Sequence, residues 1–165
     1  MKRRIPPIYP ITDTVLSGLS HLEQVKLLIE AGAEIVQLRE KNAASEDFFA
    51  AAVDSVSYAA GHGVKILIND RADIALAAGA AGVHVGQNDL PPAAVRKFLG
   101  SGALIGFSTH TLEQAAEAAK MPVDYIAFGP IFPTGTKADT DPVVGLDMLG
   151  EVRSLVGDIP LVAIG

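Results

Sequence analysis

Polar side chains follow several short apolar runs of this sequence, at the points where those runs end. Asp70 comes shortly after the run Val64 to Ile68, and Asp89 follows Gly82 to Val85. Two carboxylates with open coordination positions beside them suit Mg²⁺, which keeps several waters and shares phosphate oxygens. Each aspartate could instead cap the helix expected after it. The pair together predicts a magnesium site for a phosphorylated substrate.

Cationic residues follow another apolar run, where they could bind the anionic group that such a metal would also contact. Gln37, Arg39 and Lys41 alternate from the run Ile35 to Leu38 onward, so their side chains share one facing while the strand lasts. Arg grips an anionic group by bidentate contact and Lys acts as a point charge. The alternative is a charged loop with ion pairs to Glu40.

The long connection over residues 129–145 is rich in proline and glycine, which excludes a continuous helix. Its hydroxyls and ammonium, from Thr134, Thr136 and Lys137, lie around Gly135. Backbone N–H groups beside such a glycine can form a cradle for an anion, most simply a phosphate. A solvated surface loop is the alternative.

Further donors follow the run Leu104 to Phe107. Thr111 already explains the start of the next helix, so Ser108 and His110 are available for another role. His84, by contrast, fits the interior of the fold better than a metal site. Mg²⁺ with a highly charged anion such as pyrophosphate would balance the combined cations and carboxylates.

The elements that position these residues alternate regularly along the chain. Short, nearly continuous apolar runs are typical of strands buried on both faces, and helical patterns lie between them, several opened by Ser, Thr or Pro and closed by Gly. Strands are expected at 8–12, 35–38, 64–68, 82–85, 104–107, 125–128 and 161–164, and helices from Ser20 to Gly32, Ser45 to Gly61, 71–78, 93–99, Thr111 to Ala119 and 146–156.

Strict alternation of strand and helix implies a parallel sheet with right-handed crossovers. An open doubly wound sheet and a barrel both satisfy it. The dinucleotide fingerprint Gly-x-Gly-x-x-Gly is missing after the first strand. Polar residues end many successive strands, which is typical of barrels whose active sites are built from the loops after the strands. We therefore expect one α/β domain over residues 1–165, a (β/α)₈ TIM-type barrel that is incomplete because the sequence ends after strand seven.

Composition limits the classes of function. The 165 residues are 49% apolar, enough for a sizeable core, and the absence of cysteine excludes disulfides and thiolate chemistry. A net charge of −6 argues against a general nucleic-acid surface. No apolar run approaches the ~18 residues of a membrane span. We expect a cytoplasmic protein that binds neither nucleic acid nor membrane.

Taken in order, these motifs resemble the thiamine-phosphate synthase family over nearly the whole chain. Pro10 departs slightly, because a leucine-type residue is more usual there. The matching blocks are Tyr9 to Asp13, Gln37 to Lys41, Ile68 to Arg71, Gly82 to Gln87 with Asp89, Gly106 to His110, Gly129 to Thr134 with Thr136 and Lys137, and Ala163 to Gly165.

The resemblance implies a barrel transferase of thiamine biosynthesis that joins a hydroxymethylpyrimidine diphosphate to a thiazole phosphate and releases pyrophosphate. It implies Mg²⁺ at Asp70 and Asp89 and a pyrimidine contact at Gln37. Gly165 would belong to the thiazole-phosphate site. The diphosphate would be held by Arg39, Lys41, Asn69, Ser108, Thr134, Thr136 and Lys137, of which Arg39, Ser108 and Lys137 would act in catalysis.

Two other functions compete with this one. The related thiazole tautomerase shares the barrel and would use His110 as its acid–base group, without diphosphate or Mg²⁺. A non-catalytic barrel that binds phosphate ligands is the second. A barrel without strand eight exposes two edges, so we also expect a chain that keeps the Mg²⁺–diphosphate half-site, lacks the thiazole-phosphate pocket, and is inactive and either unstable or paired as a homo-oligomer.

Overall fold

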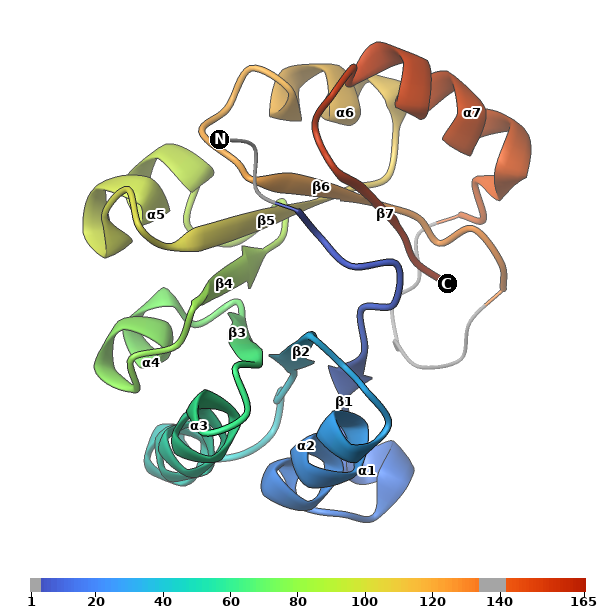
Figure 1. Ribbon diagram of the computed structural model, residues 1–165. Helices are drawn as coiled ribbons and strands as arrows, with labels where there is room; N and C mark the ends of the chain where they lie inside the picture. The colour runs from blue at the N-terminus through green and yellow to red at the C-terminus, as the bar shows by residue number, and fades with distance from the viewer. Residues whose placement is uncertain (1–3, 134–141) are drawn as a thin grey trace.

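Seven parallel strands form one curled sheet with its helices on the outer side (Figure 1). The computed structural model describes residues 4–133 and 142–165. Neighbouring strands in space are neighbours in sequence, in the order β1-β2-β3-β4-β5-β6-β7. The strands are β1 (Ile11–Thr12), β2 (Ile35–Leu38), β3 (Lys65–Asn69), β4 (Gly82–Val85), β5 (Leu104–Thr109), β6 (Tyr125–Phe128) and β7 (Leu161–Ala163).

This sequential order confirms an incomplete α/β barrel rather than a doubly wound sheet, in which the strand order would reverse. The helices that connect the strands are α1 (Thr14–Ser17), α2 (His21–Glu30), α3 (Ser45–Ala60), α4 (Ala72–Ala77), α5 (Pro92–Leu99), α6 (Leu112–Ala118) and α7 (Gly145–Leu155). Within residues 4–133 and 142–165, no helix is long and apolar enough to cross a membrane.

Two of the expected side-chain caps, those of α2 and α6, are confirmed. Ser20 and Glu23 form the complete capping box of α2, and the Thr111 side chain accepts from the Gln114 N–H at the start of α6. The expected cap at Ser45 is wrong, because this residue already lies in the first turn of α3. Its hydroxyl accepts from Arg71 Nη1 instead, at 3.0 Å.

Two local expectations near the N-terminus also need correction. The first strand is only Ile11–Thr12, since Pro10 has no N–H to give to the ladder and contributes only its carbonyl, which accepts from Gln37 N at 3.0 Å. Helix α1 was not expected. The Asp13 side chain caps it, and Gly18 closes it in the left-handed conformation.

The alternation of side chains along the strands divides the interior into layers. Outward-facing apolar residues pack under the helices in the larger core. Inward-facing residues at the strand starts form a smaller apolar layer, which the segment before β1 joins through Ile5 and Tyr9. The smaller layer consists of Ile35, Leu67, Leu104 and Tyr125. One step nearer the strand ends, the buried inward positions are polar: Gln37, Asn69 and His84.

Candidate active site

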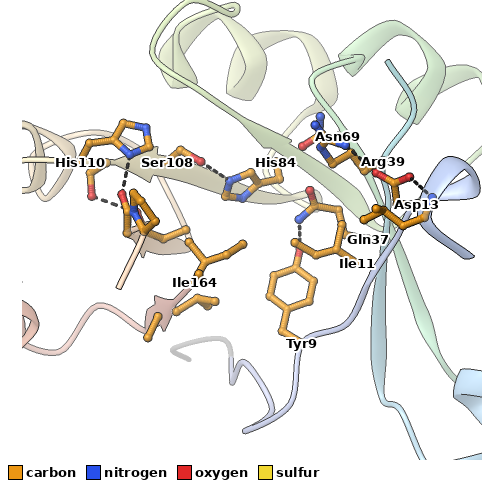
Figure 2. A pocket seen from close by; sticks show the side chains of 18 residues that line it. Tyr9, Ile11, Asp13, Gln37, Arg39, Asn69, His84, Ser108, His110 and Ile164 are labelled. Carbon is orange, nitrogen blue, oxygen red and sulfur yellow. Dashed lines mark hydrogen bonds and ion pairs between the residues drawn. The ribbon is translucent and has the colours of Figure 1, made fainter. Parts of the chain in front are cut away.

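A cavity of about 420 Å³ opens at the carboxyl ends of the strands (Figure 2). Its apolar lining includes Ile11, Leu16, Val162 and Ile164, and polar side chains line the same cavity. Six of the residues expected to act on substrate line the cavity: Gln37, Arg39, Asn69, Ser108, His110 and Gly165.

Lys41, Asp70 and Asp89 are not among the described residues that line this cavity. Thr134, Thr136 and Lys137, the expected anion cradle, lie outside the described residues.

Arg39 is fixed at the cavity wall by an ion pair. Its Nη1 donates to Asp13 Oδ2 at 2.8 Å, while Asp13 Oδ1 accepts from the first N–H groups of α1 (Figure 2). Asp13 therefore orients the guanidinium and the helix start together. The expected alternative of an ion pair with Glu40 is wrong for Arg39, whose partner comes from the end of β1.

The two aspartates expected to bind metal lie side by side. Asp89 Oδ2 accepts from Gly86 N at 2.7 Å. Burial raises the pKa of the Asp89 carboxyl, and the charge of Asp70, which can accept a hydrogen bond from the protonated Asp89 carboxyl, raises that pKa further. Lys41 Nζ contacts Asp70 Oδ2. A cation bound between the two groups would offset the repulsion that Asp89 experiences from Asp70.

Neither aspartate caps a helix. The N-cap position of α4 is Arg71 and that of α5 is Pro91, and no side chain caps either helix. The capping alternative is therefore wrong for both Asp70 and Asp89. Within the described part of the chain no group of three or more His, Cys, Asp or Glu residues could hold a metal ion, so among these residues a metal here would have only the two carboxylates as protein ligands.

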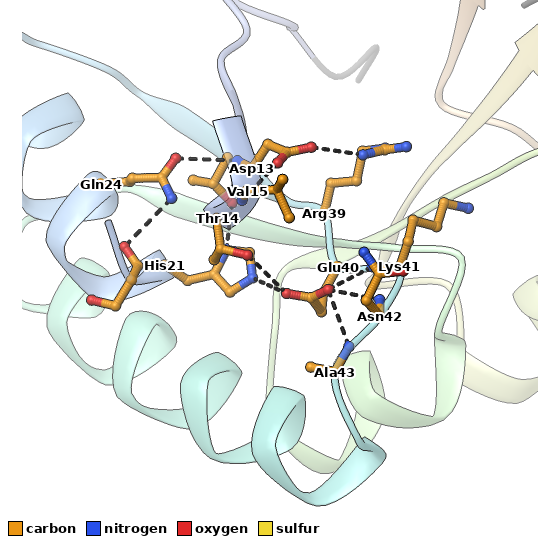
Figure 3. A network of polar contacts seen from close by, with 12 residues as sticks. Asp13, Thr14, Val15, His21, Gln24, Arg39, Glu40, Lys41, Asn42 and Ala43 are labelled. Atoms are coloured by element: carbon orange, nitrogen blue, oxygen red, sulfur yellow. Dashed lines mark hydrogen bonds and ion pairs between the residues drawn. The ribbon is translucent and has the colours of Figure 1, made fainter. Parts of the chain in front are cut away.

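Glu40 organises the loop that carries Arg39 and Lys41 (Figure 3). Its Oε1 accepts from the N–H groups of Lys41, Asn42 and Ala43 at 2.8, 2.8 and 3.2 Å. Burial alone would raise the pKa of the Glu40 carboxyl, but these backbone donors and the Thr14 hydroxyl outweigh it and lower that pKa. Glu40 thus serves the backbone of the loop rather than its cations.

His21 lies behind this loop with its ring buried. Its Nδ1 is 2.7 Å from Thr12 Oγ, and its Nε2 is 3.5 Å from Glu40 Oε2. Burial lowers the pKa of His21 below 6.5, although the charges of Glu40 and Asp13 act in the opposite direction.

Acid should therefore destabilise the protein through His21. Because the folded pKa lies below the unfolded one, this contribution to stability is present above pH 6.5 and is lost as the pH falls through the folded pKa. Thermal unfolding between pH 7.5 and 5 should show a shallower loss in His21→Gln than in the wild type. Replacing His62, which is exposed after α3, should keep the wild-type slope, and equal slopes for all three proteins would contradict this assignment.

A chain of buried and partly buried hydrogen bonds crosses the floor of the cavity. Gln37 Nε2 donates to Tyr9 Oη at 3.1 Å, and Tyr9 Oη lies 2.6 Å from Tyr125 Oη. Tyr125 Oη is 2.9 Å from His84 Nδ1, and His84 Nε2 is 2.7 Å from Ser108 Oγ. The expectation that His84 belongs to the interior is confirmed, as its exposed fraction is 7%.

The two phenols of this chain were not expected in the site. Tyr125 is the first residue of an apolar strand, a position that predicts a core residue, and Tyr9 precedes the first strand. A buried phenol nevertheless needs a hydrogen-bond partner, and that need is the only signal the sequence carries. Burial raises the pKa of Tyr9 to about 12 and raises the pKa of Tyr125 well above 10, so both hydroxyls keep their protons.

Known proteins are similar to this chain in fold and sequence. A family model described as thiamine monophosphate synthase matches residues 8–165. The chain belongs to the thiamine monophosphate synthase family.

Its similarity to individual members of the thiamine monophosphate synthase family is high. Thiamine-phosphate synthase of Syntrophomonas wolfei is 45% identical over 159 residues, which are 96% of this chain and 76% of that protein. Thiamine-phosphate synthase of Methanospirillum hungatei is 43% identical over 96% of this chain and 77% of its own length. A solved structure of thiamine phosphate pyrophosphorylase from Pyrococcus furiosus superposes with a TM-score of 0.84 at 33% identity, over 95% of this chain and 73% of that one.

Proposed function

We propose that this protein is a thiamine-phosphate synthase, a transferase that joins a hydroxymethylpyrimidine diphosphate to a thiazole phosphate and releases pyrophosphate. The observation that carries the proposal is the family match over residues 8–165, with relatives at 45% identity that bear this name. The geometry supports it, because Arg39, Asn69 and Ser108, from the ends of β2, β3 and β5, line one cavity.

The reaction needs charge stabilisation more than acid–base chemistry. Diphosphate departs from a benzylic-type carbon, the aminopyrimidine delocalises the cation that remains, and the thiazole nitrogen captures it. The protein must hold the two rings in line and stabilise the charge that develops on the leaving group. In this proposal Gln37 contacts the pyrimidine, and Arg39, Asn69 and Ser108, which line the same cavity, offer donors to the diphosphate.

Mg²⁺ fits the pair Asp70 and Asp89. Both groups supply only oxygen, burial and the neighbouring charge of Asp70 raise the pKa of Asp89, and the small number of protein ligands suits an ion that keeps waters and binds phosphate oxygens. When bound, Mg²⁺ would neutralise charge on the departing diphosphate. Lys41, which contacts Asp70, would connect this pair to the anion. Lys137, Thr134 and Thr136 complete the proposed diphosphate site on the sequence resemblance alone.

A coupled assay of pyrophosphate release tests the function. Pyrophosphate should form only when both the pyrimidine diphosphate and the thiazole phosphate are present, and chelation of Mg²⁺ should stop it. Omitting the thiazole phosphate is the control for simple hydrolysis of the diphosphate. Tight binding of both substrates without any pyrophosphate would contradict the proposal and would identify the chain as a phosphate-ligand binder.

A further inference from the structure

The hydrogen-bond chain from Gln37 to Ser108 has a direction that the donor and acceptor inventory determines. The Gln37 amide faces Tyr9 with its Nε2, which can only donate. Tyr9 Oη therefore accepts at that end and has one hydrogen of its own to give. Its only other partner among the described residues is Tyr125 Oη, so the Tyr9 hydrogen goes to Tyr125.

The remaining links follow from this first one. Tyr125 accepts from Tyr9 and gives its single hydrogen to His84 Nδ1, which is then the unprotonated nitrogen of the ring. The neutral imidazole carries its proton on Nε2 and donates it to Ser108 Oγ. Ser108 thus already accepts a bond from the protein, and its own hydrogen is available to a ligand in the cavity.

The opposite direction leaves a partly buried donor without an acceptor among the described residues. If Ser108 donated to His84, then His84 Nδ1–H would donate to Tyr125 and Tyr125 to Tyr9. Tyr9 would receive two hydrogens, from Gln37 and Tyr125, and its own would have no acceptor among the residues that the structure describes. A hydroxyl that is partly withdrawn from water and lacks an acceptor is costly, which favours the first direction.

Packing around the two central groups keeps the chain in place. Tyr125 is fully buried, and its ring stacks on the His84 imidazole with centroids 5.5 Å apart. Gly106 lies directly beside them, and a Cβ at that position would overlap both the Tyr125 phenol and His84 Nδ1. The absence of a side chain at Gly106 is what lets the phenol reach the imidazole.

We propose that Tyr9 and Tyr125 are positioning residues that hold His84 as its Nε2–H tautomer, so that Ser108 presents its hydroxyl hydrogen to the anionic group of the substrate. This inference rests on the proposed synthase function for the identity of that group, the diphosphate. Ser108 then acts as a hydrogen-bond donor that His84 orients. The two residues do not act as a nucleophile and its base, because no lone pair of the imidazole faces the serine.

The tautomer can be measured without any activity. In protein labelled with ¹⁵N-histidine, the His84 signals, assigned by their loss in His84→Gln, should show a protonated Nε2 and an unprotonated Nδ1. Tyr125→Phe removes the donor to Nδ1 and should shift that nitrogen signal. Tyr58→Phe, which changes a phenol that takes no part in this hydrogen-bond chain, should leave the Nδ1 signal unchanged. A proton on Nδ1 in the wild type would overturn the proposal.

Kinetics test whether the tautomer matters to the reaction. Loss of an aligned donor to a developing anion costs up to ~100-fold or more in kcat, and misalignment should cost less, so we expect Tyr125→Phe to lower kcat by about tenfold with a nearly unchanged KM. Tyr9→Phe, one link further away, should show a smaller loss in the same direction. Tyr58→Phe should match the wild type.

A double variant separates positioning from a general packing defect. In a Ser108→Ala background the donor is already gone, so adding Tyr125→Phe should lower kcat by less than about twofold. A further tenfold loss there would mean that Tyr125 acts through packing and would overturn the proposal.

If the wild type shows no synthase turnover, the proposed function fails, while the histidine spectrum still decides the direction of the hydrogen-bond chain. Should Tyr125→Phe fail to fold, the wild-type spectrum and Tyr9→Phe decide it.

Discussion

Replacing Asp89 with asparagine should remove the response to Mg²⁺ and lower turnover by on the order of 100-fold, since a metal that stabilises transition-state charge contributes several kcal/mol. The substitution keeps the shape of the side chain. Asparagine Oδ1 can still accept from Gly86 N, and its amide can donate to Asp70, so the local hydrogen bonds survive.

The same substitution should not destabilise the metal-free protein. Burial and the neighbouring Asp70 raise the pKa of Asp89 in the folded state. A carboxyl whose folded pKa is raised contributes less to stability as the pH rises through that value, so at neutral pH its ionisation opposes folding. Removing the charge relieves this cost. Metal-free Asp89→Asn is therefore expected to melt at or above the wild-type temperature.

Thermal unfolding with and without Mg²⁺ distinguishes a metal ligand from an ordinary surface acid. The wild type should gain stability with Mg²⁺ concentration, as expected for an ion that binds only the folded state, and Asp89→Asn should not. Asp73→Asn is the matched control, because Asp73 is an exposed partner of Arg71 on α4. A normal Mg²⁺ response in Asp89→Asn would exclude this aspartate as a ligand.

The strands were predictable where β-branched runs end sharply at polar or glycine-rich segments. The limits of β2, β4 and β6 agree with the sequence expectation. The first strand was expected too long because hydrophobicity hides the missing N–H of Pro10. Helix α1 was not predicted, because its four residues are too few to show a periodic pattern. Its only sequence signals are the cap at Asp13 and the closing Gly18.

The polar residues that line the site were predictable for a different reason. In a parallel sheet all strand ends meet at one edge, so Gln37, Asn69 and Ser108 had to converge once the alternation was recognised. Which partner each side chain takes was not predictable. Lys41 contacts Asp70 from another strand end, and Tyr9 meets Tyr125 across 116 positions of sequence. Such contacts depend on side-chain reach across the barrel, which local sequence patterns do not encode.

Gly106→Ala should be the most damaging single-methyl change at the floor of the site. A Cβ there would overlap the Tyr125 ring, which is fully buried and has no space to retreat. Forced overpacking of a core costs about 1–3 kcal/mol, and we expect the upper end because the displaced phenol also loses its bond to His84. At ~2–4 °C per kcal/mol for a domain of this size, the melting temperature should fall by about 6–12 °C.

Gly102→Ala provides the control for loss of glycine itself. Gly102 lies just before β5, and a Cβ there would meet nothing within 4 Å. Alanine at that position should be neutral or slightly stabilising, because it reduces the freedom of the unfolded chain. If both variants melt at the same temperature, Tyr125 does not rest over Gly106 as described.

A second change at position 125 identifies the source of the strain. Tyr125→Leu alone should destabilise the protein, since it empties part of the apolar layer and leaves His84 Nδ1 without its donor. In a Gly106→Ala background the same substitution removes the overlapping ring, so its cost should be smaller than in the wild type. The two changes would then be coupled in a double-mutant cycle, as expected for residues in direct contact. Additive costs would show that the methyl group at position 106 acts on the backbone of β5 and not on the phenol that supports His84.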